Sequence, residues 1–491
     1  MKKTLKMIKV FCLLIAVALL FMSCGKSQNE ISTQTTPVET TPETTTPEMT
    51  TPETTTPEVT TPEVTTPEVT TPEETTPEAT TPATDPNPQE PPQKEYSEGL
   101  RYGGILLPSG ESAVSVLGIG SCTDVDIVIP EEVDGWPVIA ISAKAFQSNN
   151  TIRSVTIPGS VKTIEEKAFY YAGALEKIYL SEGITEIRHN AFSYCKKLKE
   201  VVYPGTVTSI SDAFVGCTSL TTVIMTNNVT SMSSNAFAGC TALTTVVLSD
   251  KITIIPAGAF DDCISLTSID IPASVTKIDE TAFWGCDNLV EDVDGVYYID
   301  TWVVGSDRDI EKANIREGTV CIMTSSFNNR YNLKEVTLPQ GLLYIELYAF
   351  SRCEKIESIV IPDSVIKVEE SAFEYSDMKK LTLSAGLKTI EENAFYSPEF
   401  LETLVIPEGV EVIENYAFSL CRALRELYLP KSITKIGDCA FDFSKLERIV
   451  YAGTVEEWNS IELAEHWVSH HIVGEVVCSD GTVTIEFWPK R

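Results

Sequence analysis

The most regular feature of the chain is a pattern of apolar positions that recurs about every 23 residues. An Ala-Phe or Ser-Phe pair marks each repeat, and neighbouring pairs lie 22 or 23 residues apart except for one gap of 44. A fixed period in the twenties predicts a solenoid in which each repeat forms one coil. The phenylalanines of the 13 pairs are Phe146, Phe169, Phe192, Phe214, Phe237, Phe260, Phe283, Phe327, Phe350, Phe373, Phe395, Phe418 and Phe441.

One repeat shows how such a unit folds. Ile269 and Ile271 alternate with polar residues, which predicts a short half-buried strand. Pro272 ends this strand because proline has no N–H to donate. Val275 and Ile278 form a second apolar patch, and the Ala-Phe pair then turns the chain back with the large ring inside. A unit this small cannot fold alone, so stacked neighbours must bury a common core.

We therefore predict a β-rich solenoid with short strands, brief helical turns and about 23 residues per coil, as an array over residues 131–451. The repeated pattern Leu-x-x-Ile-x-Ile-Pro-x-x-Val-x-x-Ile-x-x-x-Ala-Phe-x-x-Cys-x-x-Leu resembles the BspA-like leucine-rich-repeat family of bacterial surface proteins. The resemblance covers about residues 127–451. It implies a curved solenoid displayed on the cell surface for adhesion or ligand binding, without a defined catalytic residue.

One unit, at residues 284–327, is irregular and about twice the normal length. Asp294 and Gly295 form a turn signal before the apolar stretch that contains Trp302. A locally widened repeat or hinge explains this unit, and a ligand pocket is the alternative. The sequence around Asp292 faintly resembles a calcium loop, but Thr301 stands where the final acidic ligand is expected.

Caps are expected at both ends of the array, because terminal coils otherwise expose core and strand edges. We assign the N-terminal cap to residues 100–130 and the C-terminal cap to residues 452–491. Thr454 and Glu457 have the spacing of a capping box and predict a short helix. Strands at 473–478 and 482–488, joined at Asp480-Gly481, would complete the C-terminal cap.

The first 23 residues predict an export signal rather than part of the fold. A basic start that contains four lysines precedes an apolar stretch from Val10 to Met22, which is too short for a standard membrane span. The following Ser23-Cys24 resembles a bacterial lipoprotein signal, which implies lipid attachment at Cys24 and an anchor with two or more acyl chains. A plain signal peptide and a retained helix are the alternatives.

Residues 24–99 predict a disordered stalk. Proline recurs every five residues from Pro37 to Pro82 in the unit Thr-Thr-Pro-Glu-X, with almost no apolar side chain to bury. Repeated prolines and like charges extend such a chain. The stalk is interpreted as a spacer that lifts the array from a membrane, with a generic flexible linker as the alternative.

Charge excludes one class of function. The chain has 70 acidic and 37 basic residues, and its formal net charge is −33. Nucleic-acid binding needs clustered Lys and Arg, so no nucleic-acid partner is expected. The excess of acid falls on both the stalk and the array, which favours solubility.

The chain contains 13 cysteines, and seven of them stand three residues after a repeat phenylalanine. Equivalent side chains of adjacent coils point the same way, which is poor disulfide geometry, so we expect buried free thiols. No Cys-x-x-Cys occurs, and zinc is not expected. These cysteines are Cys195, Cys217, Cys240, Cys263, Cys286, Cys353 and Cys421.

The sequence contains no recognisable catalytic or cofactor-binding motif, so we expect no enzyme, cofactor or metal. His466 and His470 have a helix-like spacing near Glu462 and Glu465, but no third defined ligand follows. A surface hydrolase or processing enzyme with an unrecognised site remains an alternative, and it would depend on these two histidines.

The candidate binding surface is a row of outward-facing positions, one on the first strand of each coil. The row is mostly apolar or aromatic, which indicates a contact strip along the concave sheet. The alternative is the ordinary β-propensity of branched residues. The ligand-binding candidates are Tyr179, Val202, Ile224, Val247, Asp270, Val360, Val405 and Tyr428, and the row also includes Thr156, Thr337, Thr382 and Val450.

Together these features predict a non-catalytic, monomeric protein that is lipid-anchored on the bacterial surface. Its array would bind a host or bacterial surface protein or a glycan. A passive structural spacer without a ligand is a further alternative, and the sequence does not name the ligand.

Overall fold

The computed structural model describes residues 95–468 and 473–486. The expected signal peptide, Cys24 and most of the expected stalk lie outside these residues, as do His470 and His471. The described residues form a β-solenoid of about 16 coils with about 23 residues per coil, which confirms the predicted fold class. The one helix of this part of the chain is α2 (Val455–Ser460).

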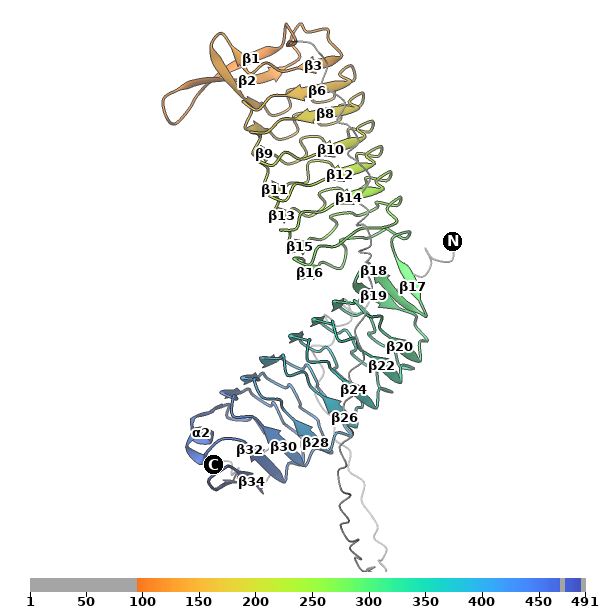
Figure 1. Cartoon of the computed structure of the whole chain (residues 1–491), viewed down its shortest axis with the longest axis vertical. Coiled ribbons are helices and arrows are strands. Elements are labelled where there is room, and N and C mark those ends of the chain that lie inside the picture. Colours follow the sequence, from red (N-terminus) through yellow and green to blue (C-terminus); the bar gives the residue numbers. More distant parts are fainter. Residues whose placement is uncertain (1–94, 469–472, 487–491) are drawn as a thin grey trace, which may run out of the picture. The chain divides into compact units, whose positions relative to one another are not determined.

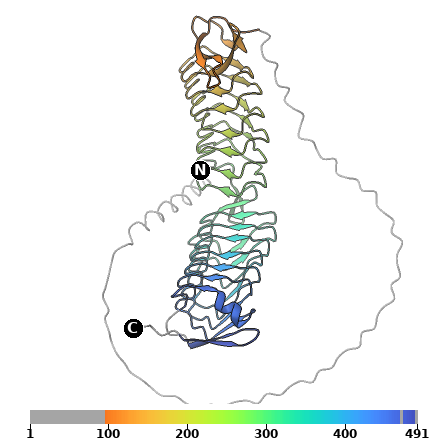
Figure 2. The same ribbon diagram turned by 90° about the vertical axis from the view of Figure 1, so that its left-hand side faces the viewer.

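Two rows of short parallel strands run through the coils (Figure 1, Figure 2). The first row comprises β3 (Asp126–Val128), β6 (Ser154–Ile157), β8 (Lys177–Leu180), β10 (Glu200–Val202), β12 (Thr222–Ile224), β14 (Thr245–Val247), β20 (Lys312–Asn314), β22 (Glu335–Thr337), β24 (Ser358–Val360), β26 (Lys380–Thr382), β28 (Thr403–Val405), β30 (Glu426–Leu429), β32 (Arg448–Tyr451) and β34 (Val473–Val477).

The second row consists mainly of two-residue strands. It comprises β5 (Trp136–Ile141), β7 (Thr163–Ile164), β9 (Glu186–Ile187), β11 (Ser209–Ile210), β13 (Ser231–Met232), β15 (Ile254–Ile255), β16 (Lys277–Ile278), β21 (Cys321–Ile322), β23 (Tyr344–Ile345), β25 (Lys367–Val368), β27 (Thr389–Ile390), β29 (Val412–Ile413), β31 (Lys435–Ile436) and β33 (Glu462–Leu463).

Each Ala-Phe segment forms an arc of consecutive turns rather than a helix. In the arc around Phe169, the N–H groups of Lys167, Phe169 and Tyr171 donate to carbonyls of the next coil. The N–H groups of Ala168 and Tyr170 instead close turns within their own coil. Lys167 and Tyr171 both have a φ of 58°, and this left-handed geometry recurs at equivalent positions in most coils. The alternation satisfies the buried backbone without a helix.

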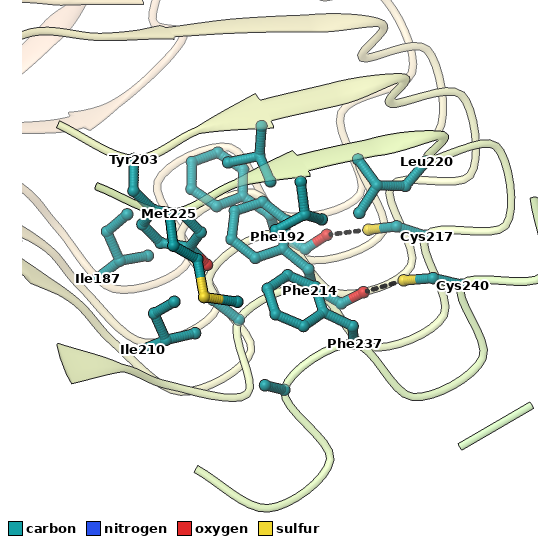
Figure 3. Packing of buried hydrophobic residues seen from close by; sticks show 14 of the residues in the cluster. Ile187, Phe192, Tyr203, Ile210, Phe214, Cys217, Leu220, Met225, Phe237 and Cys240 are labelled. Atoms are coloured by element: carbon teal, nitrogen blue, oxygen red, sulfur yellow. Dashed lines mark hydrogen bonds between the residues drawn. The ribbon is translucent and has the colours of Figure 1, made fainter. Parts of the chain in front are cut away.

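The phenylalanines of the arcs form two continuous ring stacks in the core, and Figure 3 shows part of the first. Seven rings stack from Phe146 to Phe283, and six stack from Phe327 to Phe441. Neighbouring centroids lie between 4.8 Å and 6.1 Å apart. This division into seven and six coils is the one that the spacing predicts. Buried Leu, Ile and Val side chains fill the space around each ring.

The cysteine row lies beside the stacks. The thiol of Cys217 donates to the carbonyl of Phe192 at 3.2 Å, and that of Cys240 donates to Phe214 at 3.3 Å (Figure 3). Ser376 takes the same position in its coil, and its hydroxyl donates to the carbonyl of Phe350 at 3.1 Å. A small side chain with one donor therefore suits this turn. All 11 cysteines in the described part of the chain are free thiols.

The irregular unit contains three antiparallel strands, β17 (Glu291–Val293), β18 (Val296–Ile299) and β19 (Trp302–Ser306). The predicted turn at Asp294-Gly295 joins the first two, and both residues have positive φ. The strand β19 then continues the second row by pairing with β21. The unit therefore separates the two ring stacks, and its strand β19 begins the second-row sheet of the following coils.

One predicted strand is wrong. Residues 269–271 are not assigned to a strand, although Ile269 is buried as expected. The reason is the following unit, because the next first-row strand is β20 and the intervening chain forms the β17–β19 strands. The backbone N–H of Ile271 instead donates to the carboxylate of Asp300 at 2.9 Å.

The N-terminal end is covered by a hairpin of β1 (Arg101–Leu106) and β2 (Ser112–Gly118), and β2 pairs with β5 of the second row. A short strand β4 (Glu132–Val133) pairs with the start of β5. Ser97, inside the range expected for the stalk, is buried and exchanges hydrogen bonds with Val128. The first row thus begins at β3, within the expected cap.

At the C-terminal end the predicted capping box forms and begins α2. The Thr454 hydroxyl accepts a hydrogen bond from the Glu457 N–H, and the Glu457 carboxylate accepts one from the Thr454 N–H. The indole of Trp467 meets Phe441 edge-on at 6.2 Å and ends the second ring stack. The strand β34 extends the first row, and β35 (Thr482–Glu486) pairs with it in antiparallel fashion.

Candidate ligand-binding ladder

The first-row strands bring most of the predicted binding residues into register. We call their outward-facing side chains the ladder. Backbone pairing places Val202 opposite Ile224 and Ile224 opposite Val247. Tyr428 lies between Val405 and Val450 in the same way. Further pairs in the ladder are Thr156 with Tyr179 and Val360 with Thr382.

The exposure of the ladder follows from the two-residue period of a strand. Along β10, Val201 is fully buried whereas Val202 is 46 % exposed, and β14 shows the same contrast between Val246 and Val247. Val360 and Val405 are 63 % and 56 % exposed. The residue next to each of these valines on the same strand is buried. Because side chains alternate along a strand, the branched apolar side chains of successive coils therefore face solvent.

The two tyrosines of the ladder are half-buried, whereas four of its valines are exposed: Val202, Val247, Val360 and Val405. The Tyr428 hydroxyl donates to the Glu426 carboxylate of the same strand at 3.2 Å. A ligand that touches the ladder would therefore meet aliphatic surface first, with aromatic surface at Tyr179 and Tyr428.

The ladder is interrupted at Asp270. This residue is exposed, but its segment forms no strand, so no backbone pairing places it in register with Val247. This missing strand divides the ladder into two parts, one from Thr156 to Val247 and one from Thr337 to Val450. Within these parts, β8 and β10, β22 and β24, and β26 and β28 are adjacent but belong to separate sheets.

A row of alternating charges borders the second part of the ladder and was not anticipated from the sequence. Lys334 pairs with Glu311 at 2.8 Å, and Lys379 pairs with Glu357 at 2.9 Å. The Lys334 ammonium lowers the pKa of Glu311 through this hydrogen bond. The period of 22 or 23 residues with alternating sign is visible in the sequence once the coils are aligned: Glu311, Lys334, Glu357, Lys379, Glu402, Arg425 and Glu447. Because these pairs are exposed, each contributes at most about 1 kcal/mol to stability.

The other candidate residues that the structure describes form no recognisable site. His466 lies in the C-terminal cap with its Nδ1 3.6 Å from an Asp438 carboxylate oxygen. The Asp292 carboxylate accepts a hydrogen bond from the Gly295 N–H at 3.1 Å, as in an ordinary turn. Among the residues that the structure describes, no group of three or more His, Cys, Asp or Glu side chains is placed to hold a metal ion.

No helix within residues 95–468 or 473–486 is long and apolar enough to span a membrane.

Comparison with known families identifies the repeat. The BspA-type leucine-rich-repeat region, described as six copies, matches residues 122–243, 211–318, 305–411 and 344–462. These overlapping matches cover more than half of the chain. The chain belongs to the BspA-type leucine-rich-repeat family, as the repeat pattern predicts.

Several solved structures are similar to the chain. A leucine-rich cell surface protein from Faecalibacterium prausnitzii is 26 % identical over 74 % of this chain and 96 % of its own, with a TM-score of 0.35. A leucine-rich-repeat protein from Bacteroides ovatus is 24 % identical over 75 % and 98 %, with a TM-score of 0.38. The pneumococcal vaccine antigen PcpA is 18 % identical over 78 % and 98 %, with a TM-score of 0.31. No curated protein matches the chain.

Proposed function

We propose that this protein is a non-catalytic receptor on the bacterial surface that binds a protein or glycan through the ladder. The observation that carries the proposal is the register of exposed apolar side chains along the first-row strands. Soluble proteins rarely expose long apolar rows without a contact partner. Membership of a surface-protein family supports this assignment.

The test is a binding screen of the protein against glycan and host-protein arrays, followed by a ladder variant. Tyr179, Val202, Ile224 and Val247 are replaced together by Ser. We expect any partner found with the parent protein to lose at least tenfold in affinity, because the central side chains of a contact carry most of its energy. Unchanged affinity of a folded variant would contradict the role of the ladder.

A matched control separates this effect from a general loss of apolar surface. Four aliphatic side chains outside the ladder are at least as exposed as those changed in the ladder variant or nearly so, at 45 % to 50 %, and are replaced by Ser in the control: Val125, Ile254, Ile264 and Ile366. This control is expected to retain binding. A passive spacer would instead show no partner with any of the three proteins.

We propose further that Cys24 carries the lipid that anchors the protein, with the stalk between anchor and array. The apolar stretch before Cys24 and the Thr-Thr-Pro-Glu repeats after it support this arrangement. Metabolic labelling with palmitate in a bacterial host is expected to label the protein and not the Cys24→Ser variant. Equal labelling of both would contradict attachment at Cys24.

A further inference from the structure

A hollow of about 690 Å³ lies beside the starts of β24 and β26. It exists because one coil is a residue short. The fifth residue after the repeat phenylalanine is Lys355 in one coil and Phe400 two coils later. In the coil between them, the fifth residue is Met378, and it takes the buried position that the sixth residue takes in most other coils. Lys355 and Phe400 therefore line a gap that the missing side chain would fill.

One wall of the hollow is aromatic. The Phe400 side chain is 52 % exposed, although it belongs to the residue type that forms the core elsewhere in the array. An exposed ring face attracts cations through its quadrupole. The described part of the chain already contains two such contacts, in which the guanidinium of Arg352 lies 4.8 Å from the ring centroid of Tyr375 and that of Arg316 lies 4.2 Å from the ring centroid of Tyr298.

The lining side chains that have no ion-pair partner carry a net negative charge. Lys334 pairs with Glu311, Lys379 pairs with Glu357 of the same lining, and Glu335 pairs with Lys312. Lys355 has no carboxylate partner among the described residues and donates to the Asn332 side chain at 2.8 Å. Two lining carboxylates, those of Glu354 and Asp377, make no hydrogen bond or ion pair with any described residue.

The carboxylates around Asp377 also indicate an excess of negative charge in the hollow. Burial, together with the nearby carboxylates of Glu399 and Glu354, raises the pKa of Asp377. A bound cation would relieve this repulsion and satisfy both free carboxylates by charge-assisted hydrogen bonds.

We propose that the hollow receives an arginine or lysine side chain of a protein partner, with its stem against Phe400 and its charge between Glu354 and Asp377. The net charge of −33 favours approach of a basic partner over long distances. Ser358 lines the hollow and lies on the same face of β24 as Val360, so the hollow borders the ladder. The proposal does not depend on binding by the ladder.

The probe is the fluorescein-labelled peptide Gly-Arg-Gly-Arg-Gly, compared with the same peptide in which citrulline replaces arginine. Fluorescence anisotropy is measured with the full protein at physiological ionic strength. We expect the arginine peptide to bind and the citrulline peptide to bind about tenfold more weakly, because citrulline has the shape of arginine without its charge. Absence of binding, or equal binding of both peptides, would overturn the proposal.

Two variants locate the site. The double variant Glu354→Gln and Asp377→Asn is expected to weaken arginine-peptide binding about tenfold, and Phe400→Leu about threefold. The control Glu200→Gln and Asp250→Asn removes the same charge at two exposed positions near the ladder of the first part. Equal weakening by this control would show diffuse attraction and overturn the assignment to the hollow. The ladder variant described above should bind the peptide normally, which keeps the two proposals distinguishable.

Discussion

At the scale of single residues, six buried side-chain oxygen atoms in the described part of the chain have no hydrogen-bond partner, and the Tyr203 hydroxyl is one of them. Tyr203 is 1 % exposed, and its hydroxyl has no hydrogen-bond partner in the described part of the chain. The equivalent residues of the adjacent coils, Leu180 and Met225, are apolar. Burial raises the pKa of Tyr203 well above its usual value, so the hydroxyl is neutral but unpaired.

Removing this hydroxyl should stabilise the array. We expect Tyr203→Phe to raise the free energy of unfolding by about 1 kcal/mol, because a buried unpaired hydroxyl is costly. Urea denaturation followed by circular dichroism measures the change. The control is Tyr298→Phe, since the Tyr298 oxygen accepts a hydrogen bond from the Arg316 N–H at 3.2 Å and its loss should destabilise. A destabilised Tyr203→Phe would contradict the prediction.

The residues that the sequence predicted best are those whose surroundings repeat. Every repeat phenylalanine is buried, because each coil offers the same ring site between two identical neighbours. The surroundings of Tyr203 and Phe400 do not repeat, so the pattern does not predict them. The Tyr203 hydroxyl lacks a hydrogen-bond partner, and Phe400 borders a shortened coil. Both features depend on the atoms that neighbouring coils present.

At the scale of elements, a buried arginine holds the irregular unit to the next coil. Arg330 is 4 % exposed and occupies the position that cysteine takes in many other coils. Its guanidinium donates to the Ser306 hydroxyl at 2.9 Å, to the Ser306 carbonyl at 3.0 Å and to the Asn328 carbonyl at 2.7 Å. Ser306 ends β19, so this side chain fastens that strand to the arc of Phe327.

Arg330→Met should therefore loosen β19. Three acceptors lose their donor, which we expect to cost on the order of 1–3 kcal/mol. Hydrogen exchange of residues 302–306 should accelerate, whereas Arg352→Met, which changes an exposed arginine of the next coil, should leave it unchanged. Unaltered exchange in Arg330→Met would show that strand pairing alone holds β19.

Elements were predictable where one coil suffices to define them and less so where two coils must agree. The turn at Asp294-Gly295 and the capping box at Thr454 depend on local residues, and both form. The strand at 269–271 has the right alternation but lies against an irregular neighbour, so it does not form. Strand pairing is a property of adjacent coils, and the alternation of apolar residues describes only one of them.

At the scale of the whole molecule, a contribution to stability that one coil makes is repeated along the array. Each coil contacts mainly its neighbours, so the stability of a solenoid is approximately a sum over coils and interfaces.

Burial raises the pKa of the thiols of Cys195, Cys217, Cys240, Cys353 and Cys421, to about 12 for Cys217 and Cys353. A cysteine in an unfolded chain has a pKa near its usual value of 9.0.

This row of thiols should make the array sensitive to alkali. The folded state holds the proton more tightly than the unfolded state, so the contribution of Cys217 and of Cys353 is complete below pH 9 and is lost between about pH 9 and pH 12. Each of these two thiols should lower the free energy of unfolding by about 1.4 kcal/mol per pH unit in this window. Urea midpoints measured from pH 7 to pH 11 test the slope.

Lysine and tyrosine also titrate in this range, so the decisive comparison is with a double variant, Cys217→Ser and Cys240→Ser. Serine is accommodated at the same position in the coil of Ser376, where it makes the equivalent hydrogen bond. Because serine does not ionise in this window, the variant should lose stability less steeply with pH than the parent protein. Parallel curves for the two proteins would show that the thiols do not govern the alkaline response, and that other groups of the array do.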